Sequence, residues 1–251
     1  MMQLIHSHHK WTLITGASRG IGRLIAVEMA KLGSNLILHS RSKAHAQEVL
    51  EEVLAFGVEA YAVEAALDDI PAVLRMLDEI EKRGTPVDIL FNDAGMQVAY
   101  RSEYWETPAE DFTRSFLINT IAPAMICYRL MPGMIQRGFG RVINTTSGIR
   151  NEPQQAGYST SKAALDKFTK DLGSALGDEN VAINLADPGW CRTDLGGPHA
   201  PNAPESSIPG MLVGALIEKP LRGVFLPAQA FTGMTIADAV AKAETFGKDD
   251  A

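Results

Sequence analysis

Short apolar runs alternate with longer amphipathic segments along this chain. The apolar runs predict strands at residues 11–15, 35–39, 58–63, 87–92, 141–145, 181–185 and 223–226. Apolar residues recur on one side of a 3.6-residue period between residues 21 and 32, which predicts a helix ending near Gly33. The same pattern predicts helices over 70–80 and 161–176. This alternation is typical of successive βαβ units, so we expect an α/β fold with a seven-stranded, mostly parallel sheet flanked by helices.

The predicted organisation is a single domain over residues 1–251, because no repeat, low-complexity tract or linker interrupts the series. Residues 188–220 are rich in Gly and Pro, with a short helical stretch near 211–217. A long irregular segment that leaves a central strand is usually functional, so we expect a substrate lid there. A helix is predicted at the C-terminal end, over residues 235–247.

Composition excludes several classes of protein. Apolar residues make up 46% of the 251 residues and charged residues 21%, as in ordinary globular proteins. The net charge of −7 disfavours nucleic acid as a partner. No apolar stretch approaches the roughly 20 residues of a membrane-spanning helix, and the first ten residues lack the apolar run of a secretory signal. We therefore expect a cytoplasmic protein that does not bind membranes.

The sequence gives no indication of a metal site. Cys127 and Cys191 are too few for a disulfide framework or a structural zinc site. His6, His8 and His9 are more simply interpreted as part of a solvated tail than as metal ligands.

A glycine-rich turn joins the first predicted strand to the first predicted helix. Glycine permits a tight turn and leaves no Cβ to keep a pyrophosphate from the backbone N–H groups at the positive helix end. An ordinary βα loop is the alternative, but the strand before the turn and the helix after it favour dinucleotide binding. The candidate residues are Gly16, Ser18, Arg19, Gly20, Ile21 and Gly22.

The end of the second predicted strand indicates which dinucleotide is bound. A site for NAD(H) is expected to carry Asp or Glu here, to bind the ribose hydroxyls. This chain has His39-Ser40-Arg41 instead. Without a carboxylate to repel it, a 2′-phosphate could be held by Arg41 together with Arg19. The sequence therefore predicts NADP(H) rather than NAD(H), with two ordinary solvated arginines as the alternative.

Four further residues form a candidate catalytic group. Tyr158 and Lys162 lie four residues apart, on one face of a helix, where the lysine ammonium would stabilise a phenolate and lower the tyrosine pKa. Ser147 follows the fifth strand and could bind a substrate oxygen. Asn119 precedes Pro123 by four residues, so its carbonyl lacks a helical partner and could hold a water. The alternatives are a partly buried surface pair of Tyr158 and Lys162 and a core helix kinked at Pro123.

Six elements in this order resemble the short-chain dehydrogenase/reductase family over roughly residues 10–195. They are Thr15–Gly22, Asn92–Gly95, Asn119, Ser147, the Tyr158/Lys162 pair and Pro188–Thr193. Residues 188–197 are also similar to the branch that contains carbonyl reductases and C-factor-like proteins. The resemblance implies a doubly wound Rossmann fold in one domain.

The resemblance also implies a role for each residue of a catalytic tetrad. Tyr158 would exchange the proton, Ser147 would orient the substrate oxygen, and Asn119 would hold a relay water. Lys162 would lower the tyrosine pKa and bind the nicotinamide ribose. Thr193 and the backbone after Pro188 would hold the carboxamide. The further cofactor-binding residues implied are Asn92, Ala94, Gly95, Tyr158, Lys162, Gly189 and Cys191.

The chain departs from the family pattern in two places near this group. Asp93 stands where the family usually has a second Asn, and Ser147 precedes Tyr158 by only eleven residues. The family's C-terminal Asp-Gly-Gly strand is also missing, so a homodimer is expected more than a homotetramer. Substrate choice is assigned to the lid and to side chains facing the nicotinamide. These are Met96, Gln97, Arg150, Gln155, Trp190, Cys191 and Leu195.

The expected reaction is NADP(H)-dependent reduction of a ketone or aldehyde to an alcohol, or its reverse, on a small molecule and without a metal. One alternative is an epimerase or dehydratase that retains and recycles its nucleotide. The other is a sensor that binds NADP(H) without turnover, which the complete tetrad disfavours.

Overall fold

The seven predicted strands form one sheet in the computed structural model, which describes residues 7–246 of the 251. Every neighbouring pair is parallel, and the order is β3-β2-β1-β4-β5-β6-β7. The strands are β1 (Trp11–Ile14), β2 (Asn35–Ser40), β3 (Ala60–Glu64), β4 (Val87–Asn92), β5 (Gly140–Thr145), β6 (Val181–Asp187) and β7 (Phe225–Pro227). The strand order reverses between β1 and β4, so ligands are expected beyond the carboxyl ends of these strands.

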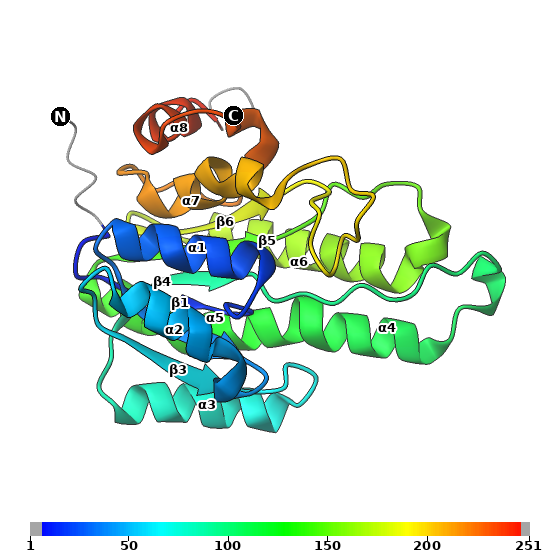
Figure 1. Ribbon diagram of the computed structural model, residues 1–251, viewed down its shortest axis with the longest axis horizontal. Helices are drawn as coiled ribbons and strands as arrows, with labels where there is room; N and C mark the ends of the chain where they lie inside the picture. The colour runs from blue at the N-terminus through cyan, green and yellow to red at the C-terminus, as the bar shows by residue number, and fades with distance from the viewer. Residues whose placement is uncertain (1–6, 247–251) are drawn as a thin grey trace.

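Helices cover both faces of this sheet (Figure 1). They are α1 (Gly20–Lys31), α2 (Gln47–Leu54), α3 (Ile70–Lys82), α4 (Ala109–Phe116), α5 (Ala122–Arg137), α6 (Ala156–Ala175), α7 (Ile208–Leu216) and α8 (Ile236–Ala243). A π-helical turn, η3 (Leu117–Ile121), joins α4 to α5. The short 3₁₀ turns are η1 (Lys43–Ala46), η2 (Tyr104–Glu106), η4 (Pro153–Gln155), η5 (Pro204–Ser207) and η6 (Ala228–Phe231).

Two hydrophobic layers hold the helices on the sheet. Strand side chains alternate between the layers: Ile14 packs with α1, α2, α7 and α8, while Leu13 packs with α3 and α5 on the other face. Leu38 packs in the same layer as Ile14, and Ile37 packs in the same layer as Leu13. Because parallel strands are covered on both faces, they consist of nearly continuous apolar runs, which is why the pattern predicted them.

The predicted lid extends too far along the chain. Residues 208–216 form α7, which is buried against β5, α1 and α8 and belongs to the core. The Gly-rich composition that predicted a loop reflects close packing instead: a Cβ on Gly210 would lie 2.2 Å from Ala228 Cα, and one on Gly214 would lie 2.6 Å from Ile143 Cδ1. Only residues 188–207 remain as a surface segment beyond β6.

Several other strands and helices begin or end a few residues from their predicted positions. The third strand begins at Ala60 rather than 58, and the sixth helix begins at Ala156, five residues earlier than predicted. The last helix ends at Ala243, and residue 247 lies outside the described residues, as do residues 1–6, which include His6. No helix within residues 7–246 is both long and apolar enough to cross a membrane.

Candidate active site

The glycine-rich turn lies at the carboxyl end of β1, where the strand order reverses. Gly16 and Gly20 have positive φ angles, +72° and +57°, which suit glycine alone among common residues. A Cβ on Gly22 would lie 2.4 Å from the Gly16 carbonyl oxygen, so no side chain fits there. Arg19, at the N-cap of α1, makes no side-chain capping bond. The first-turn N–H groups therefore lack a cap from Arg19, as an anion site requires.

His39 fixes this turn from the end of β2. The Gly16 N–H donates to His39 Nδ1 at 3.3 Å, and His39 Nε2 lies 3.1 Å from the Ala65 carbonyl oxygen. These two contacts define the neutral tautomer with its proton on Nε2. Burial lowers the pKa of His39 to about 4. Sequence reasoning missed this residue because it examined the position only for a carboxylate.

The two arginines predicted to bind a 2′-phosphate have different surroundings. Arg41 is exposed and lines a pocket of about 330 Å³ with Ala65, Ala66 and Arg75, beside the carboxyl ends of β2 and β3. Arg19 instead pairs with Asp194 of the 188–207 segment at 2.7 Å, and both side chains are exposed. The structure therefore leaves Arg41 facing the pocket, whereas Arg19 connects the turn to that segment.

The segment after β4 packs directly on the glycine-rich turn. The Ala94 N–H donates to Thr15 Oγ1 at 3.0 Å, and a Cβ on Gly16 would lie 2.9 Å from Ala94 Cα. Asn92 donates through Nδ2 to Asn144 Oδ1 at 2.8 Å, so its side chain ties β4 to β5 inside the sheet. Ala94 thus lies at the predicted cofactor site, whereas the Asn92 side chain contributes by joining strands β4 and β5.

Asn119 is held rigidly inside the π-helical turn η3. Its Oδ1 accepts from the Met96 N–H and its Nδ2 donates to the Met96 carbonyl, both at 2.8 Å. Its Nδ2 also donates to Ser161 Oγ on α6 at 3.0 Å. The turn before Pro123 has π-helical rather than regular α-helical geometry. The side chain of Asn119 connects the segment after β4 to the helix that carries Tyr158.

Tyr158 and Lys162 lie one turn apart on α6, as predicted. Tyr158 is buried, and the Ser147 hydroxyl lies close enough to its phenol to lower the pKa of that phenol. Lys162 is buried too, and its Nζ donates to the Thr145 carbonyl at 2.8 Å. The same Nζ lies 6.0 Å from the centre of the Tyr158 ring. A Cβ on Gly95 would lie 3.6 Å from both Lys162 Nζ and Asn119 Oδ1. The four predicted catalytic side chains therefore meet at one end of the sheet.

The electrostatics of the tyrosine differ from the expectation. The pKa of Tyr158 is raised, chiefly by burial and further by the negative charge of Asp187, although the Ser147 hydrogen bond opposes this. The expected lowering by Lys162 is not seen. Burial lowers the pKa of Lys162 itself to about 8, against the opposing charges of Asp93, Asp166 and Asp187.

Asp93, the departure from the family pattern, lies beside this lysine. Its Oδ1 accepts from Thr145 Oγ1 at 2.8 Å, the same residue whose carbonyl accepts from Lys162. Burial raises the pKa of Asp93 to about 6, while Thr145, Lys162 and the Gly22 N–H favour its charged form. Asp93 therefore lies between the glycine-rich turn and the catalytic lysine.

The segment after β6 returns to the glycine-rich turn. A Cβ on Gly20 would lie 3.6 Å from Thr193 Cγ2, so Thr193 lies against the turn as predicted for a cofactor contact. Cys191 is buried and forms a β-bridge with Asn202. Trp190 is exposed and donates from Nε1 to the Gly196 carbonyl at 2.7 Å.

The remaining predicted residues are placed as follows. Ser18, Ile21, Met96, Gln97, Gln155, Pro188 and Gly189 are partly buried, and Arg150 and Leu195 are exposed.

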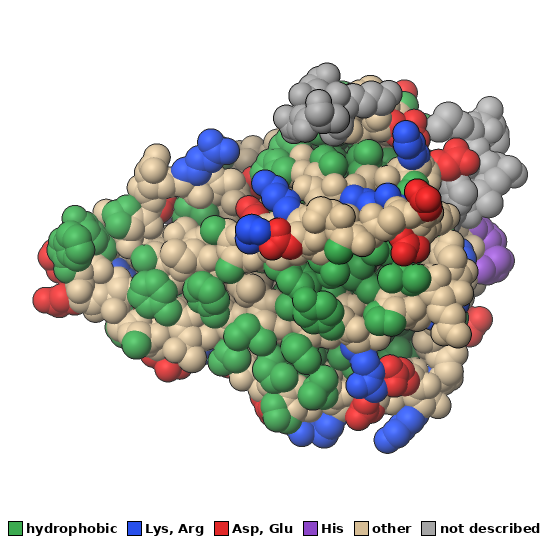
Figure 2. Space-filling model, turned by 180° about the vertical axis from the view of Figure 1, so that it is seen from behind, with side chains coloured by type: hydrophobic (Ala, Val, Ile, Leu, Met, Phe, Trp, Pro, Cys, Tyr) green, Lys and Arg blue, Asp and Glu red, His purple; other side chains and the backbone are tan. Residues whose placement is uncertain are grey.

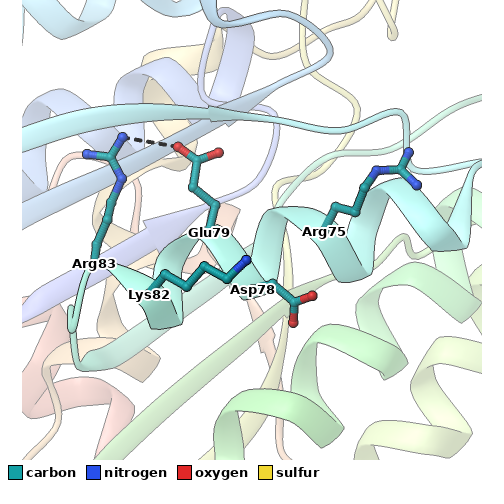
Figure 3. Close-up of a pocket in the computed structure, with 5 residues that line it drawn as sticks. All are labelled: Arg75, Asp78, Glu79, Lys82 and Arg83. Carbon is teal, nitrogen blue, oxygen red and sulfur yellow. Dashed lines mark hydrogen bonds and ion pairs between the residues drawn. The ribbon is translucent and has the colours of Figure 1, made fainter.

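A second pocket, of about 430 Å³, lies on α3 and shares Arg75 and Glu79 with the pocket that Arg41 lines (Figure 3). It is lined by Arg75, Asp78, Glu79, Lys82 and Arg83. Arg83 pairs with Glu79 one helical turn away at 3.1 Å, so the pocket is a solvated face of ion pairs. Within residues 7–246, no group of three or more His, Cys, Asp or Glu side chains is arranged to hold a metal ion.

Comparison with known proteins identifies the family of this chain. A family model for short chain dehydrogenases matches residues 10–203. Versicolorin reductase 1 of Dothistroma septosporum is 34% identical over 194 residues, which cover 74% of this chain and 71% of that protein.

Two solved structures share the fold. A metagenomic short-chain oxidoreductase in complex with NADP has a TM-score of 0.68 at 27% identity, covering 73% of this chain and 84% of the other. The promiscuous reductase LugOII, which catalyses keto-reduction at C1 during lugdunomycin biosynthesis, has a TM-score of 0.75 at 27% identity, covering 90% and 98%.

The fold and the site define a doubly wound dinucleotide-binding oxidoreductase. With the match over residues 10–203, the chain belongs to the short-chain dehydrogenase family, which confirms the resemblance drawn from its motifs. The narrower resemblance to carbonyl reductases and C-factor-like proteins stays a prediction.

Proposed function

We propose that this protein is an NADP(H)-dependent oxidoreductase that interconverts a ketone or aldehyde and the corresponding alcohol. The observation that carries the proposal is the gathering of Tyr158, Lys162 and Asn119 at one end of the sheet, with Ser147 beside the Tyr158 phenol. This group lies at the sheet end that also carries the glycine-rich turn. The turn fits a dinucleotide, since glycines 16, 20 and 22 place no Cβ over its backbone.

The chemistry follows from these side chains. The nicotinamide, when bound, supplies the hydride. The two hydroxyl groups of Ser147 and Tyr158 hold the carbonyl oxygen, and they stabilise the negative charge that develops on it. Tyr158 gives its proton to that oxygen, and Lys162, one helical turn away, would hold the nicotinamide ribose. Asn119 supports this group by holding the Met96 backbone and Ser161 in place.

The choice of NADP(H) rests on the end of β2. No carboxylate follows this strand, and Arg41 faces the pocket between β2 and α3. The metagenomic relative was solved with NADP, and L-sorbose reductase of Gluconobacter frateurii, 28% identical, with NADPH and L-sorbose. We expect Arg41→Ala to weaken NADPH by about 10- to 100-fold, the cost of a lost charge-assisted hydrogen bond, and NADH much less. Equal losses for both cofactors would place the 2′-phosphate elsewhere.

A substrate screen tests the reaction itself. Purified protein is incubated with a panel of ketones and aldehydes, with NADPH and with NADH, and net cofactor consumption is followed at 340 nm. An epimerase, a dehydratase or a sensor consumes none. Tyr158→Phe is expected to lower kcat by about 100-fold or more while leaving NADPH affinity nearly unchanged, because the proton donor is lost but the cofactor contacts stay. An active variant removes tyrosine from the mechanism.

We also propose a homodimer or homotetramer built on the face formed by α5 and α6. Ile121, Tyr128 and Ile135 are spaced seven residues apart along the rod of η3 and α5, and they are 40%, 61% and 38% exposed. Figure 2 shows hydrophobic side chains gathered over this side of the molecule. Sedimentation velocity tests the assembly: Tyr128→Glu is expected to shift the protein toward monomer, and a monomeric wild type contradicts it.

A further inference from the structure

Asp187, the last residue of β6, binds two loops at once. Its Oδ2 accepts from the Gly148 N–H at 3.0 Å, and its Oδ1 accepts from the Gly189 N–H at 2.9 Å. Gly148 directly follows Ser147, whereas Gly189 directly follows Pro188. One carboxylate therefore connects the loop that carries the substrate-binding hydroxyl to the segment predicted to hold the nicotinamide.

Both contacts require glycine. A Cβ on Gly148 would lie 2.8 Å from Asp187 Oδ2, closer than such atoms approach without movement. Gly189 has a φ of +74°, the left-handed region that other residues disfavour. The sequence Ser-Gly after β5 and Asp-Pro-Gly after β6 thus specifies this arrangement, which we name the Asp187 clamp.

The clamp acts on the orientation of Ser147. The Ile149 N–H donates to Ser147 Oγ at 3.3 Å, so the serine hydroxyl is oriented by a turn of three residues. Gly148 is the middle residue of that turn, and its N–H is the group that Asp187 holds. A shift of Gly148 would therefore move the hydroxyl relative to the Tyr158 phenol, whose pKa it lowers.

Other charged and titratable groups face the clamp. Tyr158, Lys162 and Asp166 approach it from α6, and Cys191 from the segment after β6. Burial raises the pKa of Asp187, while the two glycine N–H groups and the Lys162 ammonium favour its carboxylate. The acceptor of both bonds is thus a charged group stabilised by its surroundings.

We propose that Asp187 is a positioning residue, which sets the Ser147 hydroxyl against the nicotinamide-binding segment by holding Gly148 and Gly189 together. This inference rests on the proposed reductase function. Because Asp187 acts through Ser147, its loss affects the rate of the chemical step more than it affects cofactor binding.

The variants Asp187→Asn and Asp166→Asn test the clamp in the full-length enzyme. Asn at 187 places an NH₂ group against one of the two N–H groups, so one bond is lost. We expect kcat to fall by about 10- to 100-fold and the Kd of NADPH to change by less than about 3-fold. Asp166 also faces Lys162 but bonds only to the Thr146 hydroxyl, so its variant controls for charge. An equal fall in kcat for both variants overturns the proposal.

An NMR titration of the wild type tests the clamp without activity. The ¹H–¹⁵N signals of Gly148 and Gly189 are expected to shift with one common midpoint, above the ordinary aspartate pKa of about 3.9. This midpoint is expected to persist in Asp166→Asn and vanish in Asp187→Asn. Separate midpoints, or none, overturn the proposal. If no carbonyl consumes NADPH but the two glycines titrate together, the proposed function fails and the clamp remains.

Discussion

Acidification is expected to destabilise the fold through His39. This imidazole is 2% exposed, and burial lowers its pKa from 6.5 to about 4. The unfolded chain therefore takes up a proton at His39 as the pH falls through 6.5, whereas the folded chain does not until about pH 4. Stability is lost across this window, by about 2 kcal/mol at pH 5 and about 3 kcal/mol in full.

Asp93 has the opposite effect on stability over nearly the same pH range. Its folded pKa, about 6, lies above its ordinary value of 3.8. The folded protein thus binds this proton more tightly than the unfolded chain does. The resulting stability is complete below pH 3.8 and is lost as the pH rises through 6, with a magnitude of about 3 kcal/mol. In the wild type, the contributions of His39 and Asp93 to the pH dependence of the free energy of unfolding therefore largely cancel.

Urea unfolding followed by circular dichroism at pH 8, 7, 6 and 5 separates them. Asn at position 39 keeps an acceptor for the Gly16 N–H and cannot be protonated, so His39→Asn is expected to lose about 2 kcal/mol less than wild type between pH 8 and pH 5. Asp93→Asn is expected to lose about 1 kcal/mol more than wild type over the same range. The exposed His45 on η1 provides the control, and His45→Asn is expected to follow the wild-type curve. If His39→Asn also follows it, burial of the neutral imidazole does not govern the acid response.

Three further outcomes test the site. Gly22→Ala is expected to weaken NADPH at least about 10-fold by fluorescence titration, because its Cβ would meet the Gly16 carbonyl oxygen at 2.4 Å; unchanged affinity refutes the packing argument. Asp194→Asn frees Arg19 from an exposed ion pair, so NADPH is expected to tighten by up to about 5-fold relative to NADH; no change means that Arg19 does not reach the 2′-phosphate. Lys162 loses its proton as the pH rises through about 8, so kcat for reduction is expected to fall above that pH; a flat profile to pH 9 contradicts this.

The sequence predicted the sheet well because strands β2, β4, β5 and β6 are buried on both faces along nearly their whole length. Periodicity misled only where close packing uses residues that are also typical of loops. Gly210 and Gly214 let α7 approach Ala228 and the side chain of Ile143, yet in the sequence they appear as helix breakers beside Pro209. A local pattern cannot distinguish a glycine required by a neighbouring backbone from one required by a turn.

The candidate site also contains residues whose role the sequence predicted and one whose role it did not. Tyr158 and Lys162 were predictable because one helical turn joins them. The role of His39 was not, because its two partners, Gly16 and Ala65, lie on either side of it in the sheet and 23 and 26 residues away in the chain. A polar side chain inside an otherwise apolar strand was the available signal.

The position of Asp93 could be read from the sequence, but its effect could not. Burial alone would deprive Lys162 of its proton, since an ammonium group with one backbone carbonyl as its partner is costly to desolvate. The charges of Asp93, Asp166 and Asp187 oppose this and hold the pKa near 8. Asp187 meanwhile raises the pKa of Tyr158, so the charge that keeps the lysine protonated also keeps the phenol protonated. Both groups are then in the form that the proposed carbonyl reduction requires, a neutral proton donor and, one helical turn away, a protonated lysine.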